Sequence, residues 1–429
     1  MKHTLSLRLD QVLISGVIES TGLAFGWTII LLVVAERGGL GSASLMSAAM
    51  LSGIAVSAPL SAWLSARFAP RDLLRILAVA EGACRLAVFG LLWRHADTQL
   101  MALVVIGMTA LAWSGFAAMR TEVSRVEVSE VEHGIDNGRY FTWFAVAMAS
   151  SEVLAAGAAA FLLDHSPSTV LLTAVTIVYV LSLAPQWWVG TYADPIRHPS
   201  VARLIDVRAV IAPAGLGAVV FLFAGAPALL ATVLAYDLYG STGVVVSAVA
   251  FTVGSLGATW MQARLAGWRP PALSLLVLGG LLIGGWSMSG HTLFGLIIAQ
   301  GCAGLAQCAL EGELDGRIVS RSPVDSASTA LAFSSCSRAL GGAVAVLLLP
   351  VLLRHTTLPV VATVIAVSLL FAAGALAMGH VLYPIRHFPP SFAVGFAAGV
   401  VTGVVADAAV RVRETAGVSR PSMAAWGRR

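Results

Sequence analysis

The chain has 429 residues, of which 58% are apolar and only 11% are charged, with a mean hydropathy of +0.87. Soluble domains carry about 25% charged residues, so the composition excludes a soluble protein and favours one that folds in a lipid bilayer. The formal net charge is +4, and lysine occurs once, at Lys2, which excludes a phosphate-binding P-loop and any cofactor held by an interior lysine. With no other catalytic motif or metal-ligand spacing, we expect neither an enzyme, nor a cofactor, nor a metal site.

Apolar stretches long enough to cross a bilayer follow one another along nearly the whole chain. About 20 helical residues span a hydrocarbon core of about 30 Å. The first stretch is longer than a signal-peptide core and leads directly into the second, so we expect it to remain as a signal anchor. The pattern predicts twelve spans, at 11–35, 42–66, 72–93, 99–119, 140–163, 168–190, 209–236, 242–263, 271–289, 292–311, 327–353 and 358–383.

A further apolar stretch, 391–410, allows two interpretations. Gly395, Gly399 and Gly403 place three glycines on one helix face, which suits close packing of helices. A thirteenth span would, however, bury Asp407 and move the arginines of the tail to the other side of the membrane. We therefore favour an interfacial or re-entrant helix for this stretch.

The basic residues gather in alternate loops. Only Arg37, Arg94 and Arg354 fall in the loops of the opposite set. Because positive charge is retained on the cytoplasmic side during insertion, we expect a multi-pass protein of the cell membrane with both termini in the cytoplasm. Its positive charge would face anionic membrane lipid, and nucleic acid is not expected as a partner.

The two halves of the chain resemble each other. Residues 41–67 and 240–264 both open with Gly-Ser and close with Ala-Arg, and residues 151–163 match 337–349. Repeats of this kind are typical of secondary transporters. They predict an N-terminal six-span bundle, a cytoplasmic linker, a C-terminal six-span bundle and a cytoplasmic tail, at 1–190, 191–208, 209–383 and 384–429.

Over residues 8–383 this organisation resembles the major facilitator superfamily. The resemblance implies an all-α integral membrane fold of two six-helix bundles related by pseudo-two-fold symmetry. That family carries Gly-x-Leu-x-Asp-Arg-x-Gly-Arg-Arg after its second span, and Arg67 and Arg71 match it here as candidate gating-loop residues. Ala62 and Ala66 stand where the family has Gly and Asp, which departs from its usual charge relay.

Two further comparisons concern branches of that family. The Gly-Pro pair that drug antiporters carry in span 5 is missing, and Ala155 and Ala156 occupy the matching positions. Glu81 and Arg85 in span 3 look similar to an acid-plus-arginine feature of the macrolide-efflux and siderophore-exporter branch. Being four residues apart, they can form a structural ion pair, or protonation of Glu81 can release Arg85 to a new partner.

Three other charged side chains fall inside predicted spans, where a charge costs about 2.5–3.5 kcal/mol and so requires a partner or a function. The repeat places Glu152 and Arg338 at equivalent positions, near the axis that relates the halves. Glu152 is a candidate for proton or substrate coupling, and Arg338 for holding an anionic group or Glu152 itself. Glu19 lies in span 1, which lines the central cavity in the resembling family. It is either a coupling residue or a carboxyl group buried against a neighbouring span.

Polar and aromatic side chains complete the candidate set. Gln300 and Gln307 lie two turns apart on one face of span 10, where they could bind a solute or another helix. Trp27 and Trp113 lie deep enough to stack against a ligand, whereas other tryptophans near span ends are interface anchors. Charged groups near span ends are expected to be solvated; these are Asp237, Glu311, Glu313 and Asp315. The four cysteines are expected to be packing residues; these are Cys84, Cys302, Cys308 and Cys336.

Three functions follow from these patterns. The leading hypothesis is a monomeric secondary transporter that exports a small amphipathic or lipophilic molecule, coupled to protons, by alternating access. Few polar side chains in the spans favour an apolar solute. The alternatives are an importer of a polar or anionic solute, and a membrane scaffold or lipid-handling partner that has lost transport.

Overall fold

The computed structural model describes residues 2–131, 137–166, 168–192, 207–265, 271–289, 292–321 and 327–382. The predicted stretch 391–410, the tail and most of the linker 191–208 lie outside these ranges. Every regular element of the described part is helical. The helices are α1 Lys2–Ser65, α2 Pro70–Trp93, α3 Thr98–Val131, α4 Asn137–His165, α5 Ser168–Leu181, α6 Ala184–Tyr192, α7 Val207–Leu229, α8 Ala231–Leu256, α9 Ala258–Leu265, α10 Pro271–Gly284, the 3₁₀ turn η1 Gly285–Met288, α11 Leu293–Arg321, α12 Ala327–Leu353 and α13 Leu358–Leu382.

Within the described ranges, nine helices are long and apolar enough to cross a membrane. Two of them contain about twice the residues that one crossing needs, with apolar stretches of 52 and 49 residues at Ile14–Ser65 and Pro213–Met261. A shorter apolar helix covers Ala272–Met288. The all-α membrane architecture is therefore confirmed, while the count of twelve crossings stays a prediction.

The two longest helical runs are broken by glycines of the same conformation. Gly39 in α1 has φ +68° and ψ −171°, and Gly240 in α8 has φ +62° and ψ −156°. Positive φ is strained for residues that carry a Cβ, so glycine is the residue that suits both breaks. The breaks lie where residues 35–42 and 236–242 were expected to connect spans. The two stretches that resemble each other in sequence thus begin at matching backbone turns.

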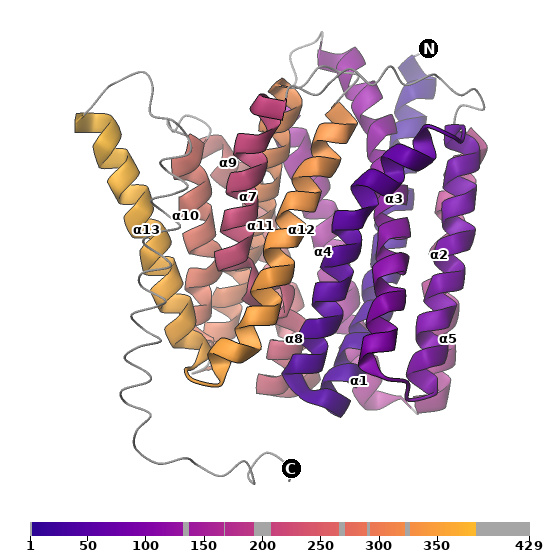
Figure 1. Ribbon diagram of the computed structural model, residues 1–429, viewed down its shortest axis with the longest axis horizontal. Coiled ribbons are helices and arrows are strands. Elements are labelled where there is room, and N and C mark those ends of the chain that lie inside the picture. The colour runs from indigo at the N-terminus through magenta and orange to yellow at the C-terminus, as the bar shows by residue number, and fades with distance from the viewer. Residues whose placement is uncertain are drawn as a thin grey trace.

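The helices pack around two hydrophobic cores. One joins α1, α2, α3 and α5, and the other joins α7, α8, α10, α11, α12 and α13. Figure 1 shows the first group on one side of the molecule, in indigo to magenta, and the second on the other, in red to yellow. Side chains of α1 and α4, including Leu51 and Val146, also belong to the second core, so these helices connect the two groups.

Polar contacts also cross between the halves. The hydroxyl groups of Ser150 on α4 and Ser255 on α8 lie 2.8 Å apart. The Cys336 thiol on α12 donates to the carbonyl oxygen of Ala55 on α1 over 3.1 Å. Both of these contacts join neutral groups.

Helix ends that were predicted to share one side of the membrane do lie together. Arg37 donates to the carbonyl oxygen of Leu92 over 3.0 Å, and Tyr236 donates to the Asp164 carboxylate over 2.7 Å. These contacts join four of the loops predicted to lie opposite the termini, in two pairs. Which compartment this side faces stays a prediction.

Large apolar side chains cover the outward faces of the bundle. Leu103, Val170, Phe294 and Phe371 each expose more than 60% of their surface. In water such exposure would leave a large apolar area unsatisfied, whereas lipid tails cover it without cost. The exposure pattern therefore agrees with the composition in assigning this protein to the bilayer.

Candidate functional site

The charged pair of α2 is buried inside the N-terminal helix group. Glu81 and Arg85 are both completely inaccessible to solvent, and Arg85 Nε donates to Glu81 Oε1 over 2.8 Å. A second hydrogen bond and ion pair joins Arg85 Nη2 to the same oxygen. The expected ion pair therefore forms, one helical turn apart on one face of α2.

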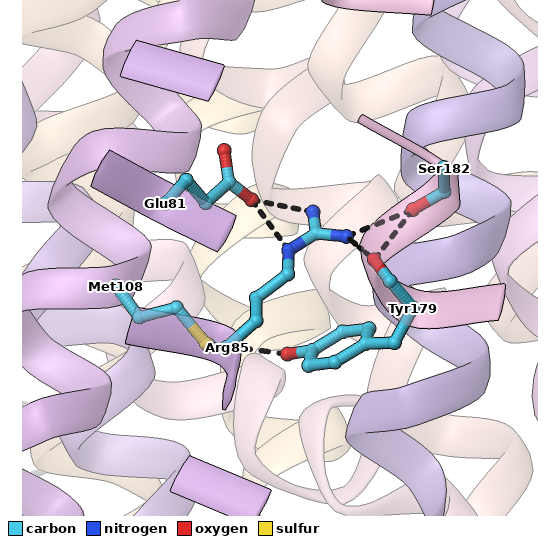
Figure 2. Close-up of polar contacts among 5 residues, drawn as sticks. All are labelled: Glu81, Arg85, Met108, Tyr179 and Ser182. Carbon is cyan, nitrogen blue, oxygen red and sulfur yellow. Dashed lines mark hydrogen bonds and ion pairs between the residues drawn. The ribbon is translucent and has the colours of Figure 1, made fainter. Parts of the chain in front are cut away.

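The α5 segment supplies the remaining partners of Arg85, as Figure 2 shows. Arg85 Nη1 donates to the Ser182 hydroxyl over 2.8 Å and to the carbonyl oxygen of Tyr179. That carbonyl is available because α5 ends at Leu181, and the last carbonyls of a helix have no partner within the helix. The guanidinium also lies 4.5 Å from the centre of the Tyr179 ring. Both ends of the guanidinium are thus satisfied without solvent.

Glu19 on α1 lies beside this pair and is also completely buried. Neither carboxyl oxygen of Glu19 has a hydrogen-bond partner, and Glu81 Oε2 also has none. The charges of Glu81 and Arg85 both act on Glu19. Two carboxyl groups therefore share one guanidinium. A single buried positive charge balances only one of them, so the cluster is neutral when one carboxyl group holds a proton.

Glycines bring α1 close to α5 at this point. A methyl group added at Gly22 would lie 2.1 Å from Ser182 Cβ, and one at Gly26 would lie 2.4 Å from the Tyr179 ring. Only a hydrogen fits at either position. This close approach places Glu19, one turn before Gly22, against the pair on α2.

The next residue of α1 faces a different neighbour. Ser20 donates a hydrogen bond to Glu152 Oε1 on α4. Glu152 is half-buried, and the charge of Glu311 on α11, in the other half of the molecule, acts on it. Glu152 therefore lies where α1 and α4 meet the second helix group. Glu19 and Glu152 belong to two separate clusters, joined by consecutive residues of α1.

Arg338 pairs within its own half. Its Nη1 donates to Asp315 Oδ1 on α11 over 2.9 Å, and its Nη2 donates to the Ser335 hydroxyl over 3.3 Å. The alternative in which Arg338 holds Glu152 is therefore not the arrangement observed. The charge of Glu311 also acts on Arg338, so Glu311 lies within electrostatic range of both residues.

Asp315 and Glu313 differ from expectation, because they are not solvated. Asp315 exposes 1% of its surface and Glu313 exposes 8%. The predicted span ended at residue 311, whereas α11 continues to Arg321 and carries both side chains into the packed interior. Glu313 forms an ion pair with Arg317 one turn later. The partners of Arg338 and Arg317 were missed because the end of this helix was set too early.

The two glutamines occupy one face of α11, as predicted. Gln300 exposes 1% of its surface, and its Nε2 has no hydrogen-bond partner. Gln307 Nε2 donates to Glu311 Oε1 over 3.4 Å. At 100° per residue, Gln300, Gln307 and Glu311 fall within about 40° of one another around the helix. They form a polar stripe on a helix that packs against α4 of the other half.

The aromatic and loop residues are dispersed. Trp27 packs against the N-terminal core, and Trp113 packs against the core that includes residues of both halves. The exposed Arg67 lies with its guanidinium 3.8 Å from the Trp63 ring centre, and Arg71 lies at the start of α2. The structure therefore does not bring the predicted site residues into one cluster.

One groove lies apart from all of these residues. It has a volume of about 410 Å³ and is lined from α2 and α5, including Phe89, Trp93 and Ile177. Trp93 and Ile177 are exposed on the outward surface, so this groove opens towards lipid. None of the predicted site residues lines it.

Tyr179, Ser182 and Asp315 are the participants that sequence reasoning missed. Tyr179 contributes a backbone carbonyl and a ring face, which leave no trace in a residue pattern. Ser182 stands at a helix junction inside a stretch that was predicted as one continuous span, 168–190. The one signal in the sequence that could have indicated this role was the polar residue Ser182 itself, inside an otherwise apolar predicted span.

Comparison with solved structures identifies the fold. A bacterial homologue of the iron transporter ferroportin matches at a TM-score of 0.56 and 13% identity, covering 86% of this chain and 98% of its own. The human organic anion transporter MFSD10 (TETRAN) matches at 0.60 and 12% identity, covering 86% and 98%. An auto-inhibited peptide transporter of the POT family matches at 0.64 and 11% identity, covering 89% and 98%. The expected major-facilitator-like fold is confirmed.

Sequence comparisons add no closer relative. No family model matches the chain. No curated protein matches it either. The solved structures that share its fold are all under 15% identical to it in the matches given above, so they establish the architecture alone.

Proposed function

We propose that this protein is a proton-coupled secondary transporter that exports a small amphipathic or lipophilic molecule. It works by alternating access between the halves 1–190 and 209–383. The neutral contacts at Ser150 and Cys336 support movement between the halves, because no ion pair has to break there when the halves separate.

One observation carries the proton coupling. Glu19 is a fully buried carboxyl group with no hydrogen-bond partner, beside two charges that already balance each other. Adding or removing one proton there switches the cluster between neutral and negative. A charge change inside a packed helix group alters which arrangement of helices is stable, and this is what couples a proton to a conformational change.

The helix α1 provides the route from that cluster to the junction of the halves. Glu19 lies within electrostatic range of Arg85, and its neighbour Ser20 holds Glu152 at the boundary with α11. A rotation or shift of α1 that follows the protonation of Glu19 changes the Ser20–Glu152 contact at the same time. Arg67 lies in the short connection between α1 and α2, and Arg71 lies at the start of α2; we assign both to the gating of that movement.

The remaining features of the proposal concern the setting. The protein lies in the cell membrane as a monomer, with both termini in the cytoplasm, where the arginine-rich loops face anionic lipid. The apolar character of the spans supports a lipophilic solute that enters from the cytoplasm or the inner leaflet.

Reconstituted vesicles with an imposed pH gradient test this function. Native protein is compared with Glu19→Gln and with Glu36→Gln, which changes the same residue type at an exposed position on the same helix. A panel of fluorescent lipophilic compounds serves as the solute. We expect Glu19→Gln to abolish gradient-driven movement while exchange of solute without a gradient continues, and Glu36→Gln to behave as native.

Two results would count against the proposal. Gradient-driven movement at the native rate in Glu19→Gln removes this residue from the coupling. Solute movement in the native protein that ignores the pH gradient removes proton coupling altogether.

A further inference from the structure

The contact between α4 and α11 contains polar side chains. Movement of the two halves relative to each other does not by itself require polar side chains at this contact. Glu152 comes from α4, and Gln300, Gln307 and Glu311 come from one face of α11. These helices belong to different halves, and they pack against each other. Any molecule bound here would contact both halves at once.

Contacts with α8 place Glu152 and Gln300 at a similar depth in the membrane. Ser255 on α8 contacts Ser150, two residues before Glu152. The adjacent Gly254 packs so closely on α11 that an added methyl group would lie 2.0 Å from the carbonyl oxygen of Gly301. Because Gly301 follows Gln300 directly, both side chains lie near the level of α8 residues 254 and 255.

Glu152 is not balanced by a cation among the residues that the structure describes. Its hydrogen bond comes from the neutral Ser20 hydroxyl, and the charge that acts on it most is the like charge of Glu311. Arg338 pairs with Asp315 and not with Glu152. A second negative charge nearby makes the potential around Glu152 more favourable for a positively charged group.

Gln300 provides an independent observation that points to a ligand at this contact. Its side chain is almost completely buried, yet its Nε2 donates to no acceptor. Buried amide donors are nearly always satisfied, because leaving one unpaired costs about 1–3 kcal/mol. The carbonyl or ether oxygen of a bound molecule would satisfy it.

The side chains around Glu152 indicate the polarity of that molecule. Ala149 and Val153, which lie close to Glu152 along α4, pack against the core that joins the two halves. These are apolar surfaces, which suit the hydrocarbon part of an amphipathic ligand. In the described part of the chain, no group of three or more His, Cys, Asp or Glu side chains could hold a metal ion. The chemistry therefore suits an organic cation better than a metal.

We propose that the junction of α1, α4 and α11 binds a lipophilic organic cation that carries a hydrogen-bond acceptor, with Glu152 as its counter-ion and Gln300 as its donor. This inference rests on the proposed transport function and names its substrate class. Ser20, which holds Glu152 in place, is a positioning residue for the same site.

A pair of probes of equal shape and opposite charge tests the site directly. Tetraphenylphosphonium and tetraphenylborate differ in charge sign but not in size or apolar surface. Binding is measured by isothermal titration with the full chain in a neutral detergent, so that no gradient and no transport are needed. We expect the phosphonium to bind at least tenfold more tightly than the borate.

Variants assign the binding to this junction. Glu152→Gln should weaken phosphonium binding at least tenfold, and Glu311→Gln should weaken it several-fold, whereas the exposed Glu36→Gln should leave it unchanged. Gln300→Leu should not change phosphonium binding, because that probe has no acceptor. It should weaken rhodamine 6G, a cation with an ester carbonyl, by about fivefold or more.

The outcomes separate this inference from transport itself. Equal binding of the two probes, or phosphonium binding that survives Glu152→Gln, overturns the cation site even if gradient-driven transport is found. Displacement of the phosphonium by millimolar Na⁺ also overturns it, since the site would then serve an inorganic ion. If Glu152→Gln fails to fold, the comparison of the two probes on the native chain and the Glu311→Gln variant still decide the matter.

Discussion

Ser20 on α1 donates a hydrogen bond to the Glu152 carboxylate on α4. The contact joins two helices that are 132 positions apart in sequence, and it lies one residue after the fully buried Glu19. Two clusters that would otherwise be independent therefore share one turn of helix. Charge changes in the first can reach the second through the backbone of α1 alone.

Loss of the Ser20 hydroxyl should weaken this connection. We expect Ser20→Ala to lower the free energy of unfolding by about 1 kcal/mol, because hydrogen bonds between membrane helices contribute roughly 0.6–2 kcal/mol. Thermal unfolding in detergent measures this. Thr21→Val is a matched control on the next residue, since the Thr21 hydroxyl bonds only to the carbonyl of Val17 in the same helix. An equal loss in both variants would contradict a specific contribution from Glu152.

The Glu81–Arg85 pair should be more sensitive to loss of one partner than to loss of both. Arg85→Met leaves Glu19 and Glu81 buried without a positive charge, which should cost about 3–5 kcal/mol. Replacing both members, with Glu81→Gln and Arg85→Met together, should recover at least half of that loss. Unfolding curves for the single and double variants test this, and a double variant less stable than Arg85→Met would be the contrary result.

Arg338 and Asp315 form a buried ion pair in the second half. Arg338→Met removes the partner of a carboxylate that exposes 1% of its surface, so we expect a loss of about 3 kcal/mol or more. Adding Asp315→Asn should restore stability in part, whereas adding Glu152→Gln should not, because Glu152 is not the partner of Arg338. Restoration by Glu152→Gln instead would show that the pairing differs from the one described here.

Close packing between α8 and α11 should make Gly304 intolerant of substitution. A methyl group at Gly304 would lie 2.1 Å from the carbonyl oxygen of Phe251, so the backbones would have to separate. We expect Gly304→Ala to cost about 2 kcal/mol or more through overpacking. Gly107→Ala is the control, because no atom lies within 4 Å of a methyl group there, and it should be neutral or stabilising. Retention of native stability in Gly304→Ala would contradict the observed helix separation.

The contact between α1 and α12 offers a test of movement between the halves. Cys336 lies against Ala55, so Ala55→Cys in a chain whose other cysteines are replaced should form a disulfide under mild oxidation. Gel mobility after cleavage between the halves detects the bond. Transport should stop on oxidation and return on reduction, because alternating access requires this contact to open. Full activity in the cross-linked protein would show that α1 and α12 stay together throughout the cycle.

Several parts of the molecule could be predicted from residue patterns because their causes are local or compositional. A bilayer demands long apolar helices, so the predicted spans fall almost entirely on helical residues, although several helix ends differ from the predicted ends. The breaks at Gly39 and Gly240 follow from the conformational freedom of glycine, and Glu81 and Arg85 pair because they are one turn apart. Each of these depends on neighbours in sequence.

Other features depended on which helices meet, and no local pattern carries that information. Repeat symmetry suggested that Glu152 and Arg338 approach each other, yet Glu152 is held by Ser20 and Arg338 by Asp315. Their helices both pack against α1 and α11, but α4 also packs against α8 and α12 against α7, so each residue meets different side chains.

The sequence alone determined that the protein folds in a lipid bilayer, where its helices lie and which charges must be buried. These features follow from hydropathy and helix geometry. Only the tertiary structure decided which charge meets which. The energy of a buried charge depends on the few atoms that surround it, and in this fold those atoms come from helices far apart in the chain.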